Sequence, residues 1–368
     1  MNRLIQRLPD GPLDIIGDVH GFIGPLEQLL ANLGYSGNAP HPDGRQLVFC
    51  GDLVDRGPDS PAVVERVMGL VAAGHAHCVL GNHELNALRG VHKEGNSWII
   101  KPDEVDADQT PVPDEQTKAR FVEFFSTLPL VLENDHLRVV HACWDPRSVE
   151  LFRDAKGSVL EVYKYYEALT RERLEAGDLR QRTKREKNDL GAGLTDQSRS
   201  PPFYPHIAAS DAIYQNGNPV RVSTSGKEEP VQRLPGELYS QPLLEPDEPP
   251  FFAGGKWRMV RRMKWWDDYR ESVPVIFGHY WRNFGSLDLA LVGKFAPDLF
   301  QGIAPHHWMG ANQNVYCVDF SIGMGKARGQ NKTSGHLAAV RFPEWRILHD
   351  EHEPGHAGIK MESNSQTG

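Results

Sequence analysis

The sequence predicts an α/β fold in which buried strands alternate with helices, and two patterns support this prediction. Short, almost continuously apolar runs recur along the chain, and each ends in a polar turn: LDIIGDVHG, QLVFCGDLVDRG, HCVLGNHE, LRVVHACWD and VPVIFGHY. Runs of about four to six apolar residues are typical of strands buried on both faces. Between the first three lie FIGPLEQLLANLG and SPAVVERVMGLVAAG, which show the apolar i, i+3, i+4 spacing of amphipathic helices and end at glycine.

This alternation predicts βαβ units packed around a sheet. In such sheets, ligands bind beyond the carboxyl ends of the strands, which is where the polar turns fall. Strands resume late in the chain, at VPVIFGHY, VYCVDFS, HLAAVRF and WRILHD. The later runs predict a second sheet layer with more antiparallel pairing.

The middle of the chain has a different composition. We expect one domain over residues 1–350, interrupted by an insertion at 150–255. The insertion begins with a charged, helix-prone stretch that contains TRERLEAGDLRQRTKREKND, and then becomes rich in Gly, Pro, Ser and acidic residues. The second part predicts long loops and a candidate lid over the site. Residues 351–368 are expected to form a polar tail without regular structure.

Charge and composition restrict the partners of the chain. The formal net charge of −9 argues against strong binding to nucleic acid or anionic lipid, so local positive charge must hold an anionic substrate. No apolar run reaches the ~18 residues of a membrane helix, and the N-terminus lacks the apolar core of a secretory signal. The four cysteines are far apart and form no CxxC pair, which favours a reducing compartment. We therefore expect a cytoplasmic enzyme.

The polar turns contain side chains suited to binding metal ions. Gly17-Asp18-Val19-His20-Gly21 offers a carboxylate and an imidazole, and the stretch from Gly51 to Gly57 offers a second carboxylate, Asp52. Asn82 and His83 follow the third run, and His141 and His279 follow two later ones. Oxygen and nitrogen donors without thiolate suit Mn²⁺, Fe or Zn²⁺. A bridging carboxylate would hold two metals ~3.5–4 Å apart, as in two-metal hydrolases.

Each of these pieces alone is more often a turn, a helix cap or a satisfied core histidine. Their occurrence in order, each at the end of a predicted strand, is what favours a metal site. The sequences GDVHG, GDLVDRG and GNHE resemble the signature of the phosphoprotein phosphatase family, within the calcineurin-like metallophosphoesterases. FFSTLPLVLENDHLRVVHACW and FGHY resemble later segments of that family. The resemblance is good over ~1–145, loose over ~256–340 and absent over ~146–255.

The resemblance implies a fold and a set of residue roles. The fold would be a four-layer αββα sandwich of mixed sheets with flanking helices. The implied cofactor is a pair of divalent metal ions, Mn²⁺ first, with Fe or Zn²⁺ as alternatives. The implied metal ligands are Asp18, His20, Asp52 as the bridge, Asn82, His141 and His279.

The catalytic roles also follow from the resemblance. A metal-bridging hydroxide would attack phosphorus in line. His83 would protonate the leaving oxygen, Asp55 would orient His83, and Arg56 would bind phosphate oxygens together with Asn82. Glu84 is expected to stabilise its loop rather than to contact substrate.

The sequence departs from the family pattern at two rims of the site. His141 is followed by Ala-Cys instead of two glycines, and His279 by Tyr-Trp-Arg instead of threonine. The second phosphate-binding arginine of the family has no clear match. The candidates are Arg258, Arg261, Arg262 and Arg282, of which Arg282 is nearest in sequence to a ligand.

Three functions compete. The first is hydrolysis of phosphate monoesters, as in bacterial protein phosphatases. The second is a nucleotide phosphoesterase, such as a diadenosine polyphosphate hydrolase or a 2′,3′-cyclic phosphodiesterase, because residues 52–84 also resemble the phosphatase module of polynucleotide kinase-phosphatases. The third, a non-catalytic scaffold, is disfavoured because the whole ligand set is intact. The expected partner is thus a phosphorylated substrate, protein or nucleotide, and the sequence leaves the oligomeric state open.

Overall fold

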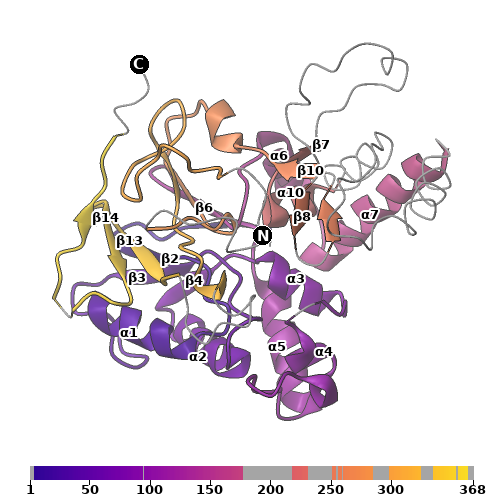
Figure 1. The fold of residues 1–368 in the computed structure, drawn as a ribbon, viewed down its shortest axis with the longest axis horizontal. Coiled ribbons are helices and arrows are strands. Elements are labelled where there is room, and N and C mark those ends of the chain that lie inside the picture. The colour runs from indigo at the N-terminus through magenta and orange to yellow at the C-terminus, as the bar shows by residue number, and fades with distance from the viewer. Residues whose placement is uncertain are drawn as a thin grey trace.

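The computed structural model describes residues 4–93, 95–176, 218–230, 251–253, 256–258, 260–284, 298–324, 335–353 and 355–363. Two mixed β-sheets lie at the centre of this part of the chain, and helices flank them (Figure 1). The predicted α/β class and the mixed sheets with flanking helices are therefore confirmed. No helix in these described ranges has the length and apolarity needed to cross a membrane.

The first sheet is six-stranded and contains the three strands that precede the first polar turns. β2 (Leu13–Ile16), β3 (Gln46–Phe49) and β4 (Ala76–Cys78) are parallel neighbours, as the βαβ pattern predicts. On the other side of β2, the order continues antiparallel through β13 (Ala338–Phe342), β14 (Arg346–His349) and β15 (Ile359–Lys360). The parallel half thus carries the first three polar turns on one edge.

The second sheet is five-stranded, in the order β1-β5-β6-β11-β12. Its strands are β1 (Ile5–Arg7), β5 (Val131–Glu133), β6 (Arg138–Val140), β11 (Val275–Phe277) and β12 (Val315–Cys317). Only β5 and β6 pair antiparallel; the other neighbours are parallel. The sequence predicted more antiparallel pairing for the late strands as a group. Among them, β11 and β12 pair parallel to each other, whereas β13, β14 and β15 pair antiparallel with their neighbours.

The two sheets pack face to face through an apolar layer. Alternate residues of the strands point into it: Leu13 and Ile15 of β2, Val48 of β3 and Ile276 of β11 all belong to one buried cluster. The residues between them, such as Phe277, belong to a second cluster on the outer faces. Burial on both faces explains why these strands read as continuous apolar runs rather than as alternating ones.

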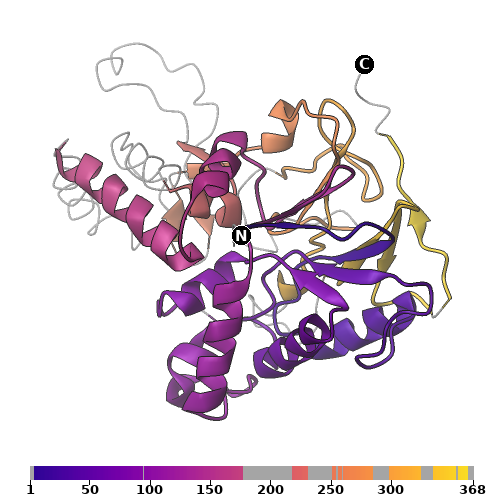
Figure 2. The same ribbon diagram turned by 180° about the vertical axis from the view of Figure 1, so that it is seen from behind.

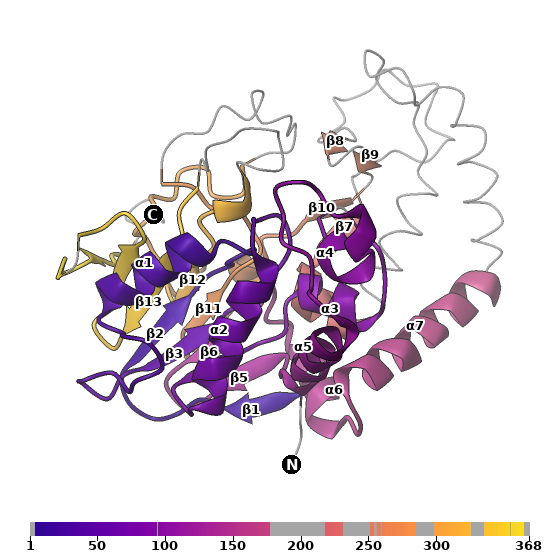
Figure 3. The same cartoon turned by 90° about the horizontal axis from the view of Figure 1, so that it is seen from below.

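Helices cover the outer faces of the sandwich. α1 (Ile23–Leu33) and α2 (Ser60–Ala72) lie along the six-stranded sheet, where α2 contacts β4 and α1 contacts β14 (Figures 1 and 3). α3 (Asn82–Leu88), α4 (Ser97–Ile100), η1 (Pro102–Glu104) and α5 (Glu115–Thr127) follow β4. Over the other sheet, Trp265 and Trp266 of η3 (Trp265–Asp268) pack against Phe277, with ring centroids 5.0 and 5.6 Å away.

The expected insertion begins with helix, as predicted, in α6 (Pro146–Asp154) and α7 (Val159–Ala176), and α7 projects to one side in Figure 2. It also contains α10 (Pro219–Ser225), whose Val220 and Val222 are buried in the main core. Two small antiparallel pairs follow: β7 (Glu228–Pro230) with β10 (Val260–Arg262), and β8 (Phe251–Ala253) with β9 (Lys256–Arg258). Most of the loop region expected as a candidate lid, residues 177–217 and 231–250, lies outside the described residues.

The polar tail is only partly without structure. Ile359 and Lys360 pair with β14, and Met361 is buried against the apolar layer between the sheets. The expectation of an unstructured tail is therefore wrong for these residues, because a two-residue strand is too short to give a periodic signal. Residues 364–368 lie outside the described part.

A buried ion network ties the six-stranded sheet to its covering helix. Asp14 of β2 is fully buried, and its carboxylate accepts hydrogen bonds from Tyr35, Arg45 and Arg341 at 3.0, 3.1 and 2.8 Å. Removing a partner from such a network leaves an unpaired buried charge, which is far costlier than losing an exposed ion pair.

We predict that Asp14→Ala lowers the free energy of unfolding by about 3 kcal/mol or more, because two arginines lose their buried partner. The matched control is Asp10→Ala. Asp10 pairs with Arg7 on the surface, where both side chains are about two-thirds exposed (68% and 65%), so its removal should leave stability unchanged. Urea unfolding followed by circular dichroism measures both variants, and equal losses would contradict the network's importance.

Candidate metal centre

The candidate ligands lie at the edge shared by the two sheets. Asp18 and His20 follow β2, Asp52 follows β3, and Asn82 and His83 follow β4 of the six-stranded sheet. His141 follows β6 and His279 follows β11 of the other sheet. Because all five strands point the same way at this edge, their carboxyl ends bring residues distant in sequence to one place.

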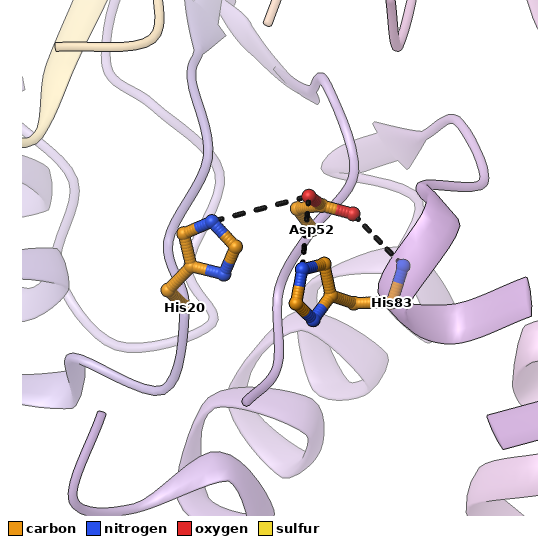
Figure 4. Close-up of side chains that lie close together, drawn as sticks. All are labelled: His20, Asp52 and His83. Carbon is orange, nitrogen blue, oxygen red and sulfur yellow. Dashed lines mark hydrogen bonds and ion pairs between the residues drawn. The ribbon is translucent and has the colours of Figure 1, made fainter. Parts of the chain in front are cut away.

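Two groups of side chains at this edge have donor atoms close enough to hold a metal ion. His20, Asp52 and His83 form one group, and Asp52, His141 and His279 form the other, with all donor atoms in each group within 4.8 Å of one another. Figure 4 shows the first group, in which both imidazoles face the Asp52 carboxylate. Asp52 belongs to both groups, which is the position required of a bridging ligand.

Backbone carbonyls fix the tautomers of two histidines. The Nδ1 atom of His20 lies 3.1 Å from the carbonyl oxygen of Val54, and Nδ1 of His141 lies 2.7 Å from that of Cys50. A carbonyl oxygen only accepts, so each Nδ1 carries the proton and each Nε2 presents its lone pair. The Nε2 of His20 is 3.8 Å from Asp18 and 3.9 Å from Asp52, and that of His141 is 3.3 Å from Asp52. This arrangement is typical of metal-binding histidines.

The side-chain amide of Asn82 lies beside His141, and its two possible orientations have different partners. Its Oδ1 faces Nε2 of His141 at 3.3 Å, so two acceptors point at each other. Turning the amide would instead let its NH₂ group donate to His141, to Nδ1 of His279 and to the carbonyl of Thr224. In the carbonyl-inward orientation the Asn82 oxygen and the two imidazoles form a donor set that fits a metal ion.

The buried carboxylates also fit a positive charge between them. Burial, together with the neighbouring Asp319 and Asp52 carboxylates, raises the pKa of Asp18 well above its usual range. Burial alone would raise the pKa of Asp52 too, but the imidazoles of His141 and His83 hold it well below its usual range. Several acidic groups in one buried space are expensive unless cations compensate them. Divalent metal ions, which the donor types favour, would supply that charge.

His83 is held by a second carboxylate. Its Nδ1 lies 2.6 Å from Oδ2 of Asp55, whose other oxygen accepts a hydrogen bond of 2.7 Å from the indole of Trp98. Burial alone would lower the pKa of His83, but Asp52 and Asp55 raise it above its usual value. A protonated imidazole does not bind a metal, so the Asp55 pair favours a proton donor over a ligand, although His83 lies close enough to serve as either.

The profile of the calcineurin-like phosphoesterase family matches residues 11–187. The chain is similar to this family over these residues, which make up a little less than half of its length. Among curated relatives it is 37% identical to bis(5′-nucleosyl)-tetraphosphatase PrpE of Oceanobacillus iheyensis over 138 residues, and 40% identical to the protein of the same name from a Geobacillus species over 139 residues. These alignments cover 35% of this chain and 54% and 56% of the relatives, so the chain spans about half the length of the curated relatives it matches.

The cold-active protein-tyrosine phosphatase of a Shewanella species aligns over 94% of this chain and 80% of its own, with 16% identity and a TM-score of 0.41. A score at this level supports no inference about function.

The expected phosphate ligand Arg56 lies beside the centre. Its guanidinium donates to Nε2 of His20 at 2.8 Å and approaches Nε2 of His83 at 3.3 Å. The ring of Trp281 covers it, with 4.6 Å between the guanidinium carbon and the ring centroid. Trp281 occupies the rim where this chain departs from the family pattern, and the structure brings it against the candidate phosphate ligand.

The other arginine candidates are not equivalent. The guanidinium of Arg282 is buried among aromatic rings and donates to the carbonyl oxygens of Ala304 and His307, so the expectation that it binds phosphate is not supported by its contacts. Its nearness to His279 in sequence was misleading, because the Arg282 side chain is buried in the core. Arg262 instead donates to the carbonyl oxygen of His279 at 2.8 Å and lies over Tyr280. The side chains of Arg258 and Arg261 lie outside the described part.

Sequence reasoning missed two elements of the site. Asp319 is buried, follows β12, and accepts hydrogen bonds from the backbone N–H of Trp281 and of Ser321, both at 2.8 Å. It obeys the same rule as the other site residues, a carboxylate directly after a buried strand, so the pattern could have found it. α10 was missed for another reason: Ser223 accepts the N–H of Ala142 at 3.0 Å through its carbonyl, a contact that no local signal announces.

Glu84 holds the loops of the candidate centre in place, and Gly278 lets the backbone approach it closely. One carboxylate oxygen of Glu84 accepts from the N–H groups of Asp52 and Gly81, at 2.9 and 3.0 Å, and the other accepts from Leu53 at 2.8 Å. The expectation that Glu84 stabilises its loop is thus confirmed. Gly278 lies against the centre itself, since a Cβ atom added there would stand 2.1 Å from Oδ1 of Asp18.

We predict that Gly278→Ala weakens metal binding at this centre by tenfold or more, because the new methyl group forces the Asp18 carboxylate out of place. Gly24→Ala in α1, where nothing lies within 4 Å of the added carbon, is the matched control and should bind metal as the unaltered chain does. Isothermal titration with Mn²⁺ measures both affinities. Unchanged affinity in Gly278→Ala would contradict the position assigned to Asp18.

Proposed function

We propose that the chain is a metal-dependent phosphoesterase of the calcineurin-like type. One observation carries this proposal: metal-binding side chains from loops of both sheets converge around the buried Asp52 carboxylate. The proposed ligands are Asp18, His20, Asp52, Asn82, His141 and His279. We propose two divalent ions, with Mn²⁺ preferred and Fe or Zn²⁺ as alternatives, because the donors are imidazoles and hard oxygens without thiolate.

When bound, two divalent ions would neutralise the phosphate oxygens and lower the pKa of water towards neutrality. The chain's own residues have other tasks. His83 donates the proton that the leaving oxygen needs, and Asp55 holds its imidazole by the 2.6 Å contact at Nδ1, leaving Nε2 to face the substrate. Arg56 binds non-bridging phosphate oxygens through its planar guanidinium. Its exchange from His20 to phosphate is favoured once the His20 lone pair is taken by a cation.

Two substrate classes agree with this site. The first is a phosphate monoester, such as a phosphorylated protein side chain, which needs only the ligand set, His83 and Arg56. The second is a bis(5′-nucleosyl) tetraphosphate, favoured by the names of the curated relatives over the matched region. Trp281 suits this second class because its half-buried ring lies directly over Arg56, where it could also stack on a nucleobase.

The cellular setting agrees with either substrate. The four cysteines are unpaired and buried, as expected in a reducing compartment, and we infer a cytoplasmic location. The net charge of −9 argues against long nucleic acid as a partner, so the proposed partner is a small phosphorylated molecule or a phosphoprotein.

We predict Mn²⁺-dependent hydrolysis of p-nitrophenyl phosphate that Asp52→Asn reduces at least a thousandfold, because the proposed bridging carboxylate loses its charge. Asp103→Asn, on the exposed surface of η1, is the matched control and should keep full activity. Steady-state rates and metal content are measured on the same samples. Full activity in Asp52→Asn would rule out the two-metal site.

The substrate class is decided by comparing kcat/KM for a phosphoserine peptide with that for diadenosine tetraphosphate under the same conditions. A preference for the peptide supports the monoester reading, and a preference for the dinucleotide supports the second class. If the metal-loaded chain hydrolysed none of the three compounds (the peptide, the dinucleotide and p-nitrophenyl phosphate), this result would contradict the proposed function.

We predict that His83→Ala loses activity in proportion to the basicity of the leaving group, because only a poor leaving oxygen needs the proton. The rate on phenyl phosphate should fall about a hundredfold or more, and the rate on p-nitrophenyl phosphate much less. Metal content should stay as in the unaltered chain, which separates a proton donor from a ligand. Equal losses on both esters, or the loss of a metal ion, would contradict the assigned role.

A further inference from the structure

A second cluster of potential ligands lies at the sheet end formed by β13 and β14 and shares no residue with the candidate centre. His336 stands just before β13, His349 ends β14, and Asp350 follows it. One ring nitrogen of each histidine and one carboxylate oxygen lie within 4.8 Å of one another. Nothing in the proposed phosphoesterase chemistry uses these side chains.

The backbone around this cluster is held rigidly. The N–H of Asp350 donates to the carbonyl of Leu337 at 2.9 Å, and the N–H of Leu337 donates back to the Asp350 carboxylate at 3.1 Å. From α1, the Asn32 amide donates to the carbonyl oxygens of His349 and Asp350, at 3.3 and 3.1 Å. The two segments that carry the ligands are thus fixed to each other before any ligand binds, which is what a selective metal site requires.

Aromatic packing orients the two imidazoles. The ring of Phe284 is stacked on Phe320 and contacts both histidines, with centroid separations of 5.4 Å to His336 and 5.1 Å to His349. His352 lies against His349, 3.5 Å between ring centroids, and its Nδ1 accepts the N–H of His349, which leaves Nε2 available. The cluster therefore offers a third imidazole at its margin.

One buried ring nitrogen in the cluster lacks a hydrogen-bond partner among the described residues. Nδ1 of His349 is buried and makes no hydrogen bond within the described part of the chain. The Asp350 carboxylate faces His336 at 3.6 Å, with Glu351 at the same distance, and provides the negative charge that a cation would find there. A buried imidazole nitrogen without a hydrogen-bond partner is costly alone, and a metal ion would relieve that cost.

From this geometry we propose a further transition-metal site formed by His336, His349 and Asp350 for a zinc-class divalent cation. Imidazole with one carboxylate suits Zn²⁺ and its neighbours and does not suit Ca²⁺ or Mg²⁺. Zn–N bonds of about 2.0–2.1 Å place tetrahedral ligand atoms about 3.4 Å apart. Donor atoms that lie up to 4.8 Å apart must therefore approach one another by up to about 1.4 Å, through rotation of the side chains. The proposal does not depend on the proposed phosphoesterase function.

The chain offers a matched comparison. His306, His307 and Glu362 also bring donor atoms within 4.8 Å, but Glu362 is 63% exposed and the two histidines are adjacent in sequence. His306→Gln is therefore the control for His349→Gln: both remove one imidazole from a three-residue group. Asp350→Asn serves as the second test variant, because the amide oxygen preserves the hydrogen bond from Leu337 while the charge is lost.

The experiment counts Zn²⁺ on the full chain without a polyhistidine tag, stripped by chelator, dialysed against zinc and analysed by mass spectrometry. We expect His349→Gln and Asp350→Asn to hold one equivalent per chain less than the unaltered protein, and His306→Gln to hold the same number. Asp52→Asn, which affects only the candidate centre, should retain the zinc-induced rise in melting temperature that His349→Gln loses.

The opposite results overturn the proposal. If both cluster variants bind as much zinc as the unaltered chain, or if the loss follows His306→Gln instead, the site does not exist. Melting of the metal-free variants by circular dichroism checks that they fold. Should His349→Gln fail to fold, the zinc count of Asp350→Asn decides the question alone.

Discussion

The structure depends on keeping several buried acids close together. Asp18, Asp52 and Asp319 are each almost fully buried at the edge shared by the sheets, and each raises the free energy of the others' ionised forms. Hydrogen bonds relieve part of this cost: the N–H of His279 donates to Asp18, and those of Trp281 and Ser321 donate to Asp319. Asp52 accepts the N–H of His83 at 3.0 Å, and the neighbouring imidazoles also stabilise its charged form. The remaining need for positive charge is what favours a metal ion at this edge over an ordinary polar loop cluster.

The loops that hold these acids are under conformational strain. His20, Asp52, Asp55, Arg56, His279, Trp281 and Ser321 all have positive φ values although none is glycine. Such conformations cost of order 1 kcal/mol or more each and persist only where surrounding contacts impose them. Here the Glu84 carboxylate imposes part of the geometry by binding three N–H groups, and the buried strands on either side fix the ends of each loop. The buried strands and the Glu84 carboxylate thus hold the candidate metal ligands in these strained conformations.

The parts that sequence predicts are those with local causes. The strands, α1 and α2 and the positions of Asp18, Asp52 and Asn82 follow from apolar runs that end in polar turns. Arg282, α10 and β15 could not be predicted, because their environment is set by residues far away in the chain: Arg282 by carbonyls of residues 304 and 307, α10 by the loop after β6, and β15 by the edge of β14. Asp319 is an intermediate case. Its position could be predicted, because it is a carboxylate directly after a buried strand, but its hydrogen-bond partners could not.

Trp281 combines backbone strain, a hydrogen bond to a buried carboxylate and a contact between the two sheets. Its backbone is left-handed, its N–H is bound by Asp319 from the neighbouring strand β12, and its ring lies over Arg56 from the other sheet. A guanidinium that makes a cation–π contact with an indole loses freedom to swing away. The contact therefore favours positions of Arg56 near Nε2 of His20 and of His83. In this chain, a residue of the second sheet thus restricts an arginine that the first sheet carries beside the candidate metal centre, so the contact between the sheets shapes this site together with the candidate ligands.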